Sequence, residues 1–149
     1  MLAQISSVDH LDCGSLSSMQ TFLPYVSFSE SAKVLDYRRL GKQRVEAMQI
    51  LNTLEGRSGG WLNHPAVKMW RGYEGALKEY SNSMINEWVS RGYKNTMKLY
   101  DVDACMIPKW LGDSRVHSSH RGNLIRKDPV YYGSLSWVED PVEGYFWPV

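Results

Sequence analysis

The sequence predicts an all-α fold: one compact domain of three helices, followed by an irregular, aromatic C-terminal segment. Three segments carry apolar residues at helical spacing, and each is bounded by a capping residue and by glycine or proline. A chain of 149 residues is also the usual size of a single domain with its own core. The domain is expected over residues 19–149. Residues 1–18, a Ser-rich run without Lys or Arg, are expected to be a disordered or non-native leader.

The first helix is expected between residues 27 and 56. Ser27 and Glu30 have capping-box spacing, with Ser29 as an alternative N-cap, and Gly56 is the expected stop. The apolar residues fall on one arc of the helix. The opposite side carries the polar residues Arg38, Arg39, Lys42, Gln43, Glu46 and Gln49. Arg44 projects into the apolar arc, where it must find a carboxylate or carbonyl partner or form the wall of a pocket.

The second helix is expected to begin near Asn63, a candidate N-cap, with Pro65 in its first turn, and to end before Gly92. Its Met and Trp residues recur at helical spacing. We interpret this stripe as core packing rather than as a cofactor site.

The third helix is expected between Asp113 or Ser114 and Pro129. His117 and His120 share one face of it, without the Cys partners or the H-E-x-x-H pattern of a metal site. We therefore expect no metal and no other cofactor, and the two histidines either bind phosphates or support the site. The tail after residue 128 has no basic residue, and its aromatic side chains either pack on the helices or offer stacking surfaces.

The net charge of +1 conceals an uneven distribution. All 17 Lys and Arg residues lie within 29–127, together with 10 of the acidic residues, so this part carries +7. A basic body between acidic ends predicts a polyanionic partner, and an evenly solvated surface is the alternative. Around Glu46, the cations Arg38, Arg39 and Lys42 form either a phosphate-binding face with one acid/base group or, for Lys42, a simple i,i+4 ion pair.

Other features narrow the class of protein. No apolar run approaches the roughly 18 residues of a membrane helix, and the N-terminus has no basic region followed by an apolar block. Cys13 and Cys105 have no metal-site spacing, which is typical of a protein in a reducing cytoplasm.

Four motifs in order resemble the pyrimidine-dimer DNA glycosylase/AP lyase family, the phage endonuclease V-like enzymes: "LDYRRLGKQRV", "HPAVKMWRGYEGALKEYSNSMINEWVSRGY", "IPKWLGD" and "RKDPVYYG". The resemblance runs from about Met19 to about Gly133. Its best signals are Tyr37-Arg38-x-Leu40, Arg91-Gly92-Tyr93 and Tyr131-Tyr132-Gly133. A bacterial and phage branch that begins "MQTFLPY" is more similar still. The resemblance implies an all-α protein that acts on double-stranded DNA with a damaged or modified base. For so small a DNA enzyme we expect a monomer, without a cofactor, in the cytoplasm of a bacterium or a phage-infected host.

The resemblance also implies a mechanism. In the family, a terminal α-amine attacks C1′ of the damaged nucleotide, a Schiff base forms as the base leaves, a glutamate assists, and β-elimination nicks the strand. When the motifs are matched, Gln20, which follows Met19, falls at the position of the family's nucleophile. Arg39 falls at the position of the family's catalytic glutamate. Glu46, two turns further along the helix, is the nearest replacement carboxylate, with Asp36 second. Arg38 and Lys42 match the two basic positions of the family's site.

Three functions remain open at this point. The first is a DNA glycosylase, with or without AP lyase activity, that excises a damaged or modified pyrimidine; its amine would come from Met19, from a processed terminus or from Lys42. The second is a glycosylase that uses water, and the third is a DNA-binding or damage-recognising module without catalysis. The candidate catalytic residues are Met19, Gln20, Arg39 and Glu46. The candidate DNA contacts are Arg38, Lys42, Arg44, His117, His120, Arg121, Arg126, Lys127, Tyr131 and Tyr132.

Overall fold

The computed structural model describes residues 19–103 and 106–149, and within these ranges the chain is helical without strands. The helices are α2 (Phe28–Val34), α3 (Tyr37–Leu54), α4 (Pro65–Lys68), α5 (Glu74–Ser90), α6 (Ser114–Lys127) and α7 (Pro129–Gly133). The all-α prediction is confirmed. The first two predicted helices are each divided in two, whereas the third corresponds to α6 and is followed by a short additional helix, α7. The predicted leader, residues 1–18, and both cysteines lie outside the described residues.

The divisions have local causes. Between α2 and α3, Leu35 and Asp36 adopt extended backbone angles, and the Asp36 carboxylate accepts a hydrogen bond from the Arg39 amide as a new N-cap. Between α6 and α7, Asp128 ends one helix and caps the next, because Pro129 has no amide hydrogen to continue the first. A single turn, α4, is separated from α5 by Gly72, whose φ of 87° lies in the left-handed region.

Most of the predicted boundaries agree with the structure. Ser27 caps α2, Asp113 caps α6, and Gly56 and Gly92 follow α3 and α5 with positive φ. The predicted cap Asn63 is wrong: the N-cap of α4 is His64, whose Nδ1 accepts the Ala66 amide at 2.9 Å.

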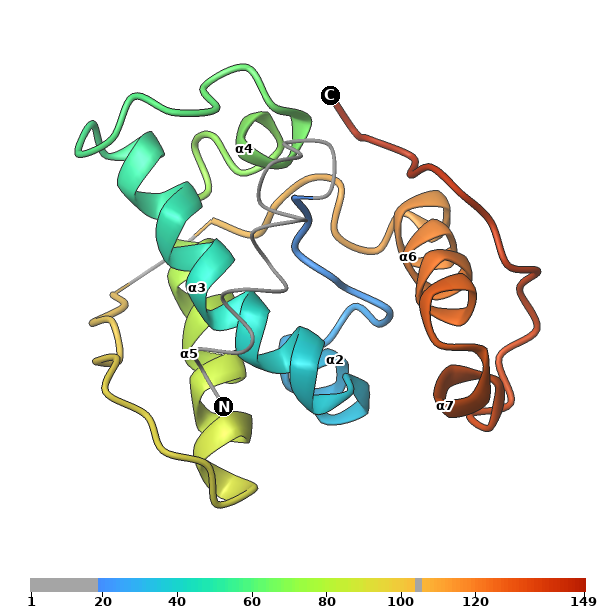
Figure 1. The fold of residues 1–149 in the computed structure, drawn as a ribbon. Helices are drawn as coiled ribbons and strands as arrows, with labels where there is room; N and C mark the ends of the chain where they lie inside the picture. Colours follow the sequence, from blue (N-terminus) through green and yellow to red (C-terminus); the bar gives the residue numbers. More distant parts are fainter. Residues whose placement is uncertain (1–18, 104–105) are drawn as a thin grey trace.

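The helices pack as two groups. Helices α3 and α5 lie side by side, α2 packs against α5, and α6 and α7 stand apart on the other side of the molecule (Figure 1). The predicted apolar stripe is buried between them, with Trp70, Tyr80, Met84 and Trp88 in the core, so its interpretation as packing is confirmed.

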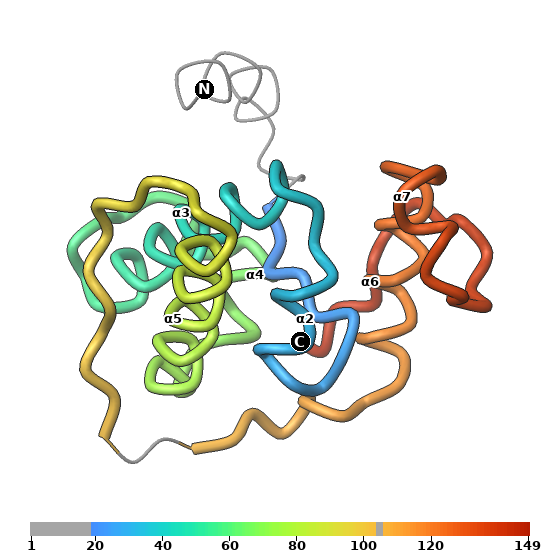
Figure 2. Tube along the Cα trace, turned by 90° about the horizontal axis from the view of Figure 1, so that it is seen from below, coloured from blue at the N-terminus to red at the C-terminus, as the bar shows by residue number. Residues whose placement is uncertain are grey.

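An irregular N-terminal segment fills the space between the two groups. Residues 19–24 run between the α3–α5 pair and α6 in both views (Figures 1 and 2). The segment has no regular secondary structure, yet Gln20, Thr21 and Leu23 have no exposed surface. Its backbone groups therefore need partners outside any helix or sheet.

The aromatic tail lies along α6. The Asn123 side chain donates to the Gly144 carbonyl at 2.7 Å, and the Phe146 amide donates to Ser119 Oγ at 3.2 Å. A Cβ at Gly122 would meet the Asp140 carbonyl at 2.9 Å, so only glycine allows this approach. Two roles were expected for the aromatic residues of the tail, packing and stacking on a ligand. Four of them are half-buried and pack against the core: Trp137, Tyr145, Phe146 and Trp147.

The α3–α5 contact gives a first prediction. A Cβ at Gly41 would lie 2.9 Å from Trp88 Cζ3, so we expect Gly41→Ala to destabilise the fold by about 1–3 kcal/mol through overpacking. Urea unfolding measures the change. Gly133→Ala in α7 is the matched control, since no heavy atom lies within 4 Å of its Cβ position. Equal stabilities of the two variants would contradict this account of the contact.

Candidate active site

Glu46 lies at the centre of α3 with one tenth of its side-chain surface exposed. Its Oε1 accepts hydrogen bonds from Gln43 Nε2 at 3.0 Å and from the Gln20 amide at 3.4 Å. Its Oε2 lies 3.8 Å from Lys42 Nζ, so the expected i,i+4 ion pair is present. The sequence pattern had put Gln43 and Glu46 on the polar side of the helix. Both are buried, because residues 19–23 cover that face.

The backbone of this covering segment is bound by side chains of three helices. Gln43 Oε1 on α3 accepts the Phe22 amide at 2.8 Å, and Tyr80 on α5 donates to the Phe22 carbonyl at 2.8 Å. The Tyr80 hydroxyl also lies 2.6 Å from Gln43 Oε1. Burial and the nearby charge of Glu46 raise the pKa of Tyr80, which keeps its hydroxyl a donor.

Two histidines of α6 hold the next residue, Leu23. The Gly112 amide donates to His117 Nε2 at 2.9 Å, so Nδ1 carries the proton and donates to the Leu23 carbonyl at 2.8 Å. The Leu23 amide donates to His120 Nδ1 at 2.8 Å, so His120 carries its proton on Nε2, and the two rings have opposite tautomers. Both must be neutral to make these bonds.

The surroundings of the histidines favour the neutral form. Burial, with smaller contributions from the neighbouring His117 and Arg121, lowers the pKa of His120 to about 3, and burial lowers the pKa of His117 as well. Of the two roles expected from the sequence, support of the site agrees with this burial. Direct phosphate binding does not, because His120 has no exposed surface.

Arg44 projects into the core as predicted. Its guanidinium stacks 4.2 Å from the centre of the Trp88 ring, and Nη1 donates to Asn95 Oδ1 at 2.7 Å. The partner is thus a carbonyl oxygen, one of the expected kinds of partner, and it belongs to a side-chain amide. Burial lowers the pKa of Arg44. With 4% of its surface exposed, Arg44 is not placed to touch a phosphate.

Two more predicted DNA contacts have internal partners. Arg121 donates to the Pro24 carbonyl at 2.6 Å and forms an ion pair with Glu139 at 2.7 Å. Tyr132 is fully buried, stacks on Trp137, and shares a short hydrogen bond with Asp36. Tyr132 is therefore not available as a surface contact in this structure, whereas Arg121 keeps about a fifth of its side chain exposed beside its internal partners.

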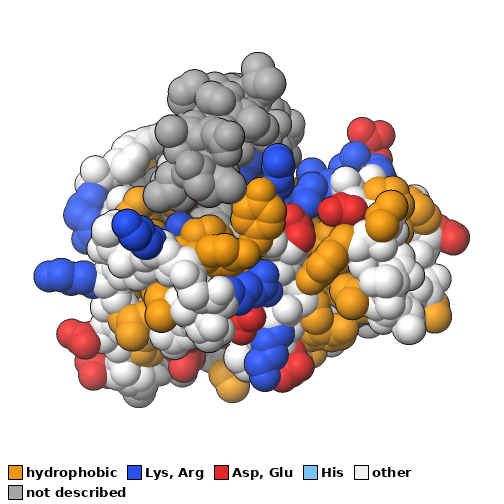
Figure 3. All heavy atoms as spheres, turned by 60° about the horizontal axis from the view of Figure 1, so that its bottom comes forward, with side chains coloured by type: hydrophobic (Ala, Val, Ile, Leu, Met, Phe, Trp, Pro, Cys, Tyr) orange, Lys and Arg blue, Asp and Glu red, His pale blue; other side chains and the backbone are white. Residues whose placement is uncertain are grey.

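The remaining predicted contacts lie at the surface or close to it. Arg38 is exposed, Arg39 pairs with Asp36 at 3.0 Å, and Arg126 and Tyr131 are exposed at the end of the molecule formed by α6 and α7, where Lys127 is half-buried. On the face shown in Figure 3, Lys and Arg side chains lie between hydrophobic and acidic ones rather than in one unbroken patch.

The three best motif signals meet at the junction of α2 and α3. Arg91 Nη2 donates to the Ala32 and Lys33 carbonyls, each at 3.1 Å. The Tyr132 hydroxyl accepts the Asp36 amide at 2.9 Å. The Tyr93 ring lies 6.2 Å from the Tyr37 ring. These motifs brace the start of α3, from which Arg38 and Arg39 project, a role that their sequence gave no sign of.

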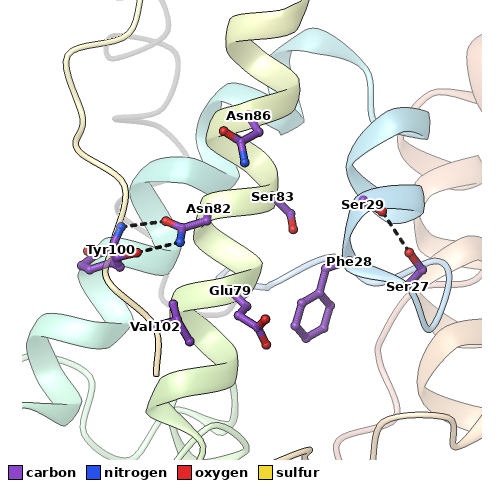
Figure 4. Close-up of a pocket in the computed structure, with 9 residues that line it drawn as sticks. All are labelled: Ser27, Phe28, Ser29, Glu79, Asn82, Ser83, Asn86, Tyr100 and Val102. Carbon is purple, nitrogen blue, oxygen red and sulfur yellow. Dashed lines mark hydrogen bonds between the residues drawn. The ribbon is translucent and has the colours of Figure 1, made fainter. Parts of the chain in front are cut away.

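A polar recess on another part of the surface has a different character. It lies between the start of α2, α5 and the segment around Tyr100, and Asn82 pairs with both backbone groups of Tyr100 at 2.8 and 2.9 Å (Figure 4). Its lining contains Glu79 and no Lys or Arg. We interpret it as the place where the chain after α5 docks, not as a phosphate site.

Residues 19–103 and 106–149 contain neither a cluster of metal-ligating side chains nor a helix that could span a membrane. In these ranges, His, Cys, Asp and Glu do not gather in groups of three that could hold a metal ion. No helix of the described chain has the length and apolar character needed to cross a bilayer.

The histidine pair gives a second prediction. Because the folded-state pKa of His120 lies below its ordinary value of about 6.5, protonation opposes folding, and stability falls as the pH drops from about 6.5 towards 3. For this group alone, the free energy of unfolding should fall by about 2–3 kcal/mol between pH 6.5 and 4.5. His120→Asn, which keeps an acceptor for the Leu23 amide, should show a shallower slope in urea titrations. An unchanged slope would exclude His120 as the titrating group.

Comparison with known proteins adds a family to this geometry. The family described as pyrimidine dimer DNA glycosylase matches residues 19–101, which include the covering segment, Gln43, Glu46 and Tyr80. No curated protein and no solved structure matches the chain. The match covers more than half of the chain and agrees with the order of motifs in the sequence. The chain therefore belongs to the pyrimidine dimer DNA glycosylase family.

Proposed function

We propose that this protein is a DNA glycosylase that releases a damaged or modified pyrimidine from duplex DNA, with Glu46 as its acid/base group. The observation that carries this proposal is the 3.4 Å contact between the Glu46 carboxylate and the Gln20 amide nitrogen. Gln20 occupies the position that matches the family's nucleophile. The Glu46 carboxylate next to Gln20 would take the place of the family's catalytic glutamate, whose position in this chain is occupied by Arg39.

The chemistry follows from a carboxylate near the sugar. As the bond between C1′ and the base nitrogen breaks, its electron pair leaves with the base, which takes up a proton, and positive charge develops at C1′. An adjacent carboxylate stabilises this charge and can accept a proton from the nucleophile. Gln43 fixes the orientation of Glu46 through its 3.0 Å hydrogen bond, and Lys42 stands at the other oxygen.

Two nucleophiles fit the position. In a chain that begins at Met19, the α-amine lies one residue before Gln20, and its ordinary pKa of about 7.7–8.0 leaves a useful neutral fraction. Attack by this amine forms an imine, which AP lyase activity requires. In a chain that continues before Met19 there is no amine at this point, and water activated by Glu46 would give base release without strand cleavage.

DNA binding is proposed to use Arg38, Arg39 and Lys42 at the start of α3, with Arg126, Lys127 and Tyr131 as a second contact region. Phosphate contacts of this kind position the duplex without reading its sequence. The bases must then be displaced to expose C1′.

Glu46→Gln tests the catalytic part of the proposal. The amide keeps the size of the side chain but cannot accept a proton, so we expect base release from UV-irradiated or oxidised duplex DNA to fall by about 10²–10⁴-fold, with DNA affinity nearly unchanged. Borohydride trapping with chains that start at Met1 and at Met19 identifies the nucleophile. An adduct on Met19 would support its α-amine as the nucleophile. Base release without an adduct would support water as the nucleophile. If the wild-type protein binds the damaged DNA but releases no base, the glycosylase proposal is wrong, and the protein acts only as a damage-recognising module.

Arg38→Ala tests the phosphate contacts. Removing one cation from the interface should reduce the slope of log K against log[salt] by about 1. Arg115→Ala is a suitable control, because Arg115 is exposed and already paired with Asp113 at 2.7 Å. Equal slopes for the wild type and the Arg38 variant, measured by fluorescence anisotropy, would remove Arg38 from the interface.

A further inference from the structure

A recess of about 510 Å³ lies beside the C-terminal end of α4, and we call it the basic recess. The described residues that line it include no Asp or Glu, and its charged and aromatic members are Lys68, Arg71, Tyr73, Lys109 and Trp110. Figure 1 places α4 near the C-terminus of the chain, at the opposite end of the molecule from α2 and the start of α3. The basic recess is therefore separate from the cations at the start of α3 that are proposed to bind DNA.

The basic recess is built where two distant segments of the chain are fastened together. The Trp110 indole donates to the Met69 carbonyl at 2.8 Å, and its ring packs edge-on against Trp70 with the ring centres 4.9 Å apart. The Lys109 amide donates to the Tyr73 hydroxyl at 3.3 Å. These contacts hold the basic residues of both segments around one hollow in the surface.

The three cations of the recess have no carboxylate partner in the part of the chain that the structure describes. Lys68 and Lys109 are exposed, and neither side chain forms an ion pair or a hydrogen bond there. Arg71 donates to the Leu62 carbonyl at 3.1 Å, which leaves its other N–H groups as donors. The nearest acidic residue in the sequence, Glu74, accepts a backbone amide at 3.3 Å and does not line the recess. Cations that gather without a counter-charge attract an anion.

The lining favours a sugar–phosphate backbone over a free nucleotide. Guanidinium and ammonium groups are the usual protein ligands of phosphate. A base would need a stacking surface as well. Trp110 has only 7% of its surface exposed and its indole N–H is already used, while Tyr73 is half-buried with its hydroxyl engaged. A DNA backbone needs only the charges, because phosphate contacts position a duplex without reading its bases.

We propose that the basic recess binds the sugar–phosphate backbone of a second DNA segment while the start of α3 holds the first. The inference rests on DNA binding at the start of α3 and goes beyond the proposed function, because it needs neither a damaged base nor catalysis. Two phosphate sites at opposite ends of one molecule let a single protein bridge two duplexes.

Energy transfer between two undamaged duplexes tests the proposal. One duplex carries a donor dye and the other an acceptor dye, and the complete chain is added. We expect the wild type to bring the dyes together. Lys68→Ala/Lys109→Ala should lower the transfer about tenfold, because two phosphate contacts are lost. Arg38→Ala should lower it as well, since bridging requires both sites.

The matched control is Lys98→Ala/Arg115→Ala, which has the same net charge as the recess variant. Both control side chains are exposed and lie outside the recess, so we expect wild-type transfer. Three results would overturn the proposal. They are full transfer in the recess variant, no transfer by a wild type that binds a single duplex, and transfer only at concentrations where sedimentation shows a protein dimer. Urea unfolding confirms that each variant is folded.

Two further measurements separate the source of the phosphate and the proposed function from this inference. Calorimetry with thymidine 5′-monophosphate detects a free nucleotide. Nucleotide binding that is lost in the recess variant, without bridging by the wild type, would overturn the DNA segment as the ligand. A protein that bridges duplexes but releases no base keeps the basic recess and rejects the glycosylase. A protein that releases the base but does not bridge rejects the basic recess alone.

Discussion

The buried backbone of residues 20–23 is the constraint on which the rest of the structure depends. An amide or carbonyl group that is buried without a partner costs about 1–3 kcal/mol. Here the partners are the side chains of Gln43, Tyr80, His117 and His120, which come from α3, α5 and α6. These helices must therefore keep one relative position, because a shift of any of them would leave polar groups unpaired in the core.

Gln43 couples this constraint to the chemistry. Its carbonyl oxygen accepts a hydrogen bond from the Phe22 amide and lies 2.6 Å from the Tyr80 hydroxyl, whose single proton is shared with the Phe22 carbonyl, so the orientation of its amide group is fixed. The other group of the same amide, the Nε2 amino group, can only donate, and it donates to the Glu46 carboxylate. The carboxylate is thus aimed by a residue that also satisfies the backbone, and the site is as rigid as the core that contains it.

Features that depend on local sequence were predictable. The caps Ser27 and Asp113, the stops Gly56 and Gly92, and the entry of Arg44 into the core follow from spacing within one helix. The burial of Glu46 was not predictable in this way, because helical periodicity does not show that residues 19–23 cover the polar side of α3. Nor were the internal roles of His120 and Tyr132, whose partners lie 97 and 96 residues away in the sequence. The functional assignment depended on the order of motifs, although the structure uses those motifs to brace a helix junction.

The histidine bonds to Leu23 have a consequence for synthesis on the ribosome. The Leu23 backbone receives its partners from α6, and His120 lies 97 residues later in the chain. At about 5–20 residues per second, this separation is a delay of roughly 5–20 s. During that interval the Phe22 backbone can already pair with Gln43 and Tyr80, whereas the amide and carbonyl of Leu23 have only water as a partner, so the segment completes its burial only when α6 has been made.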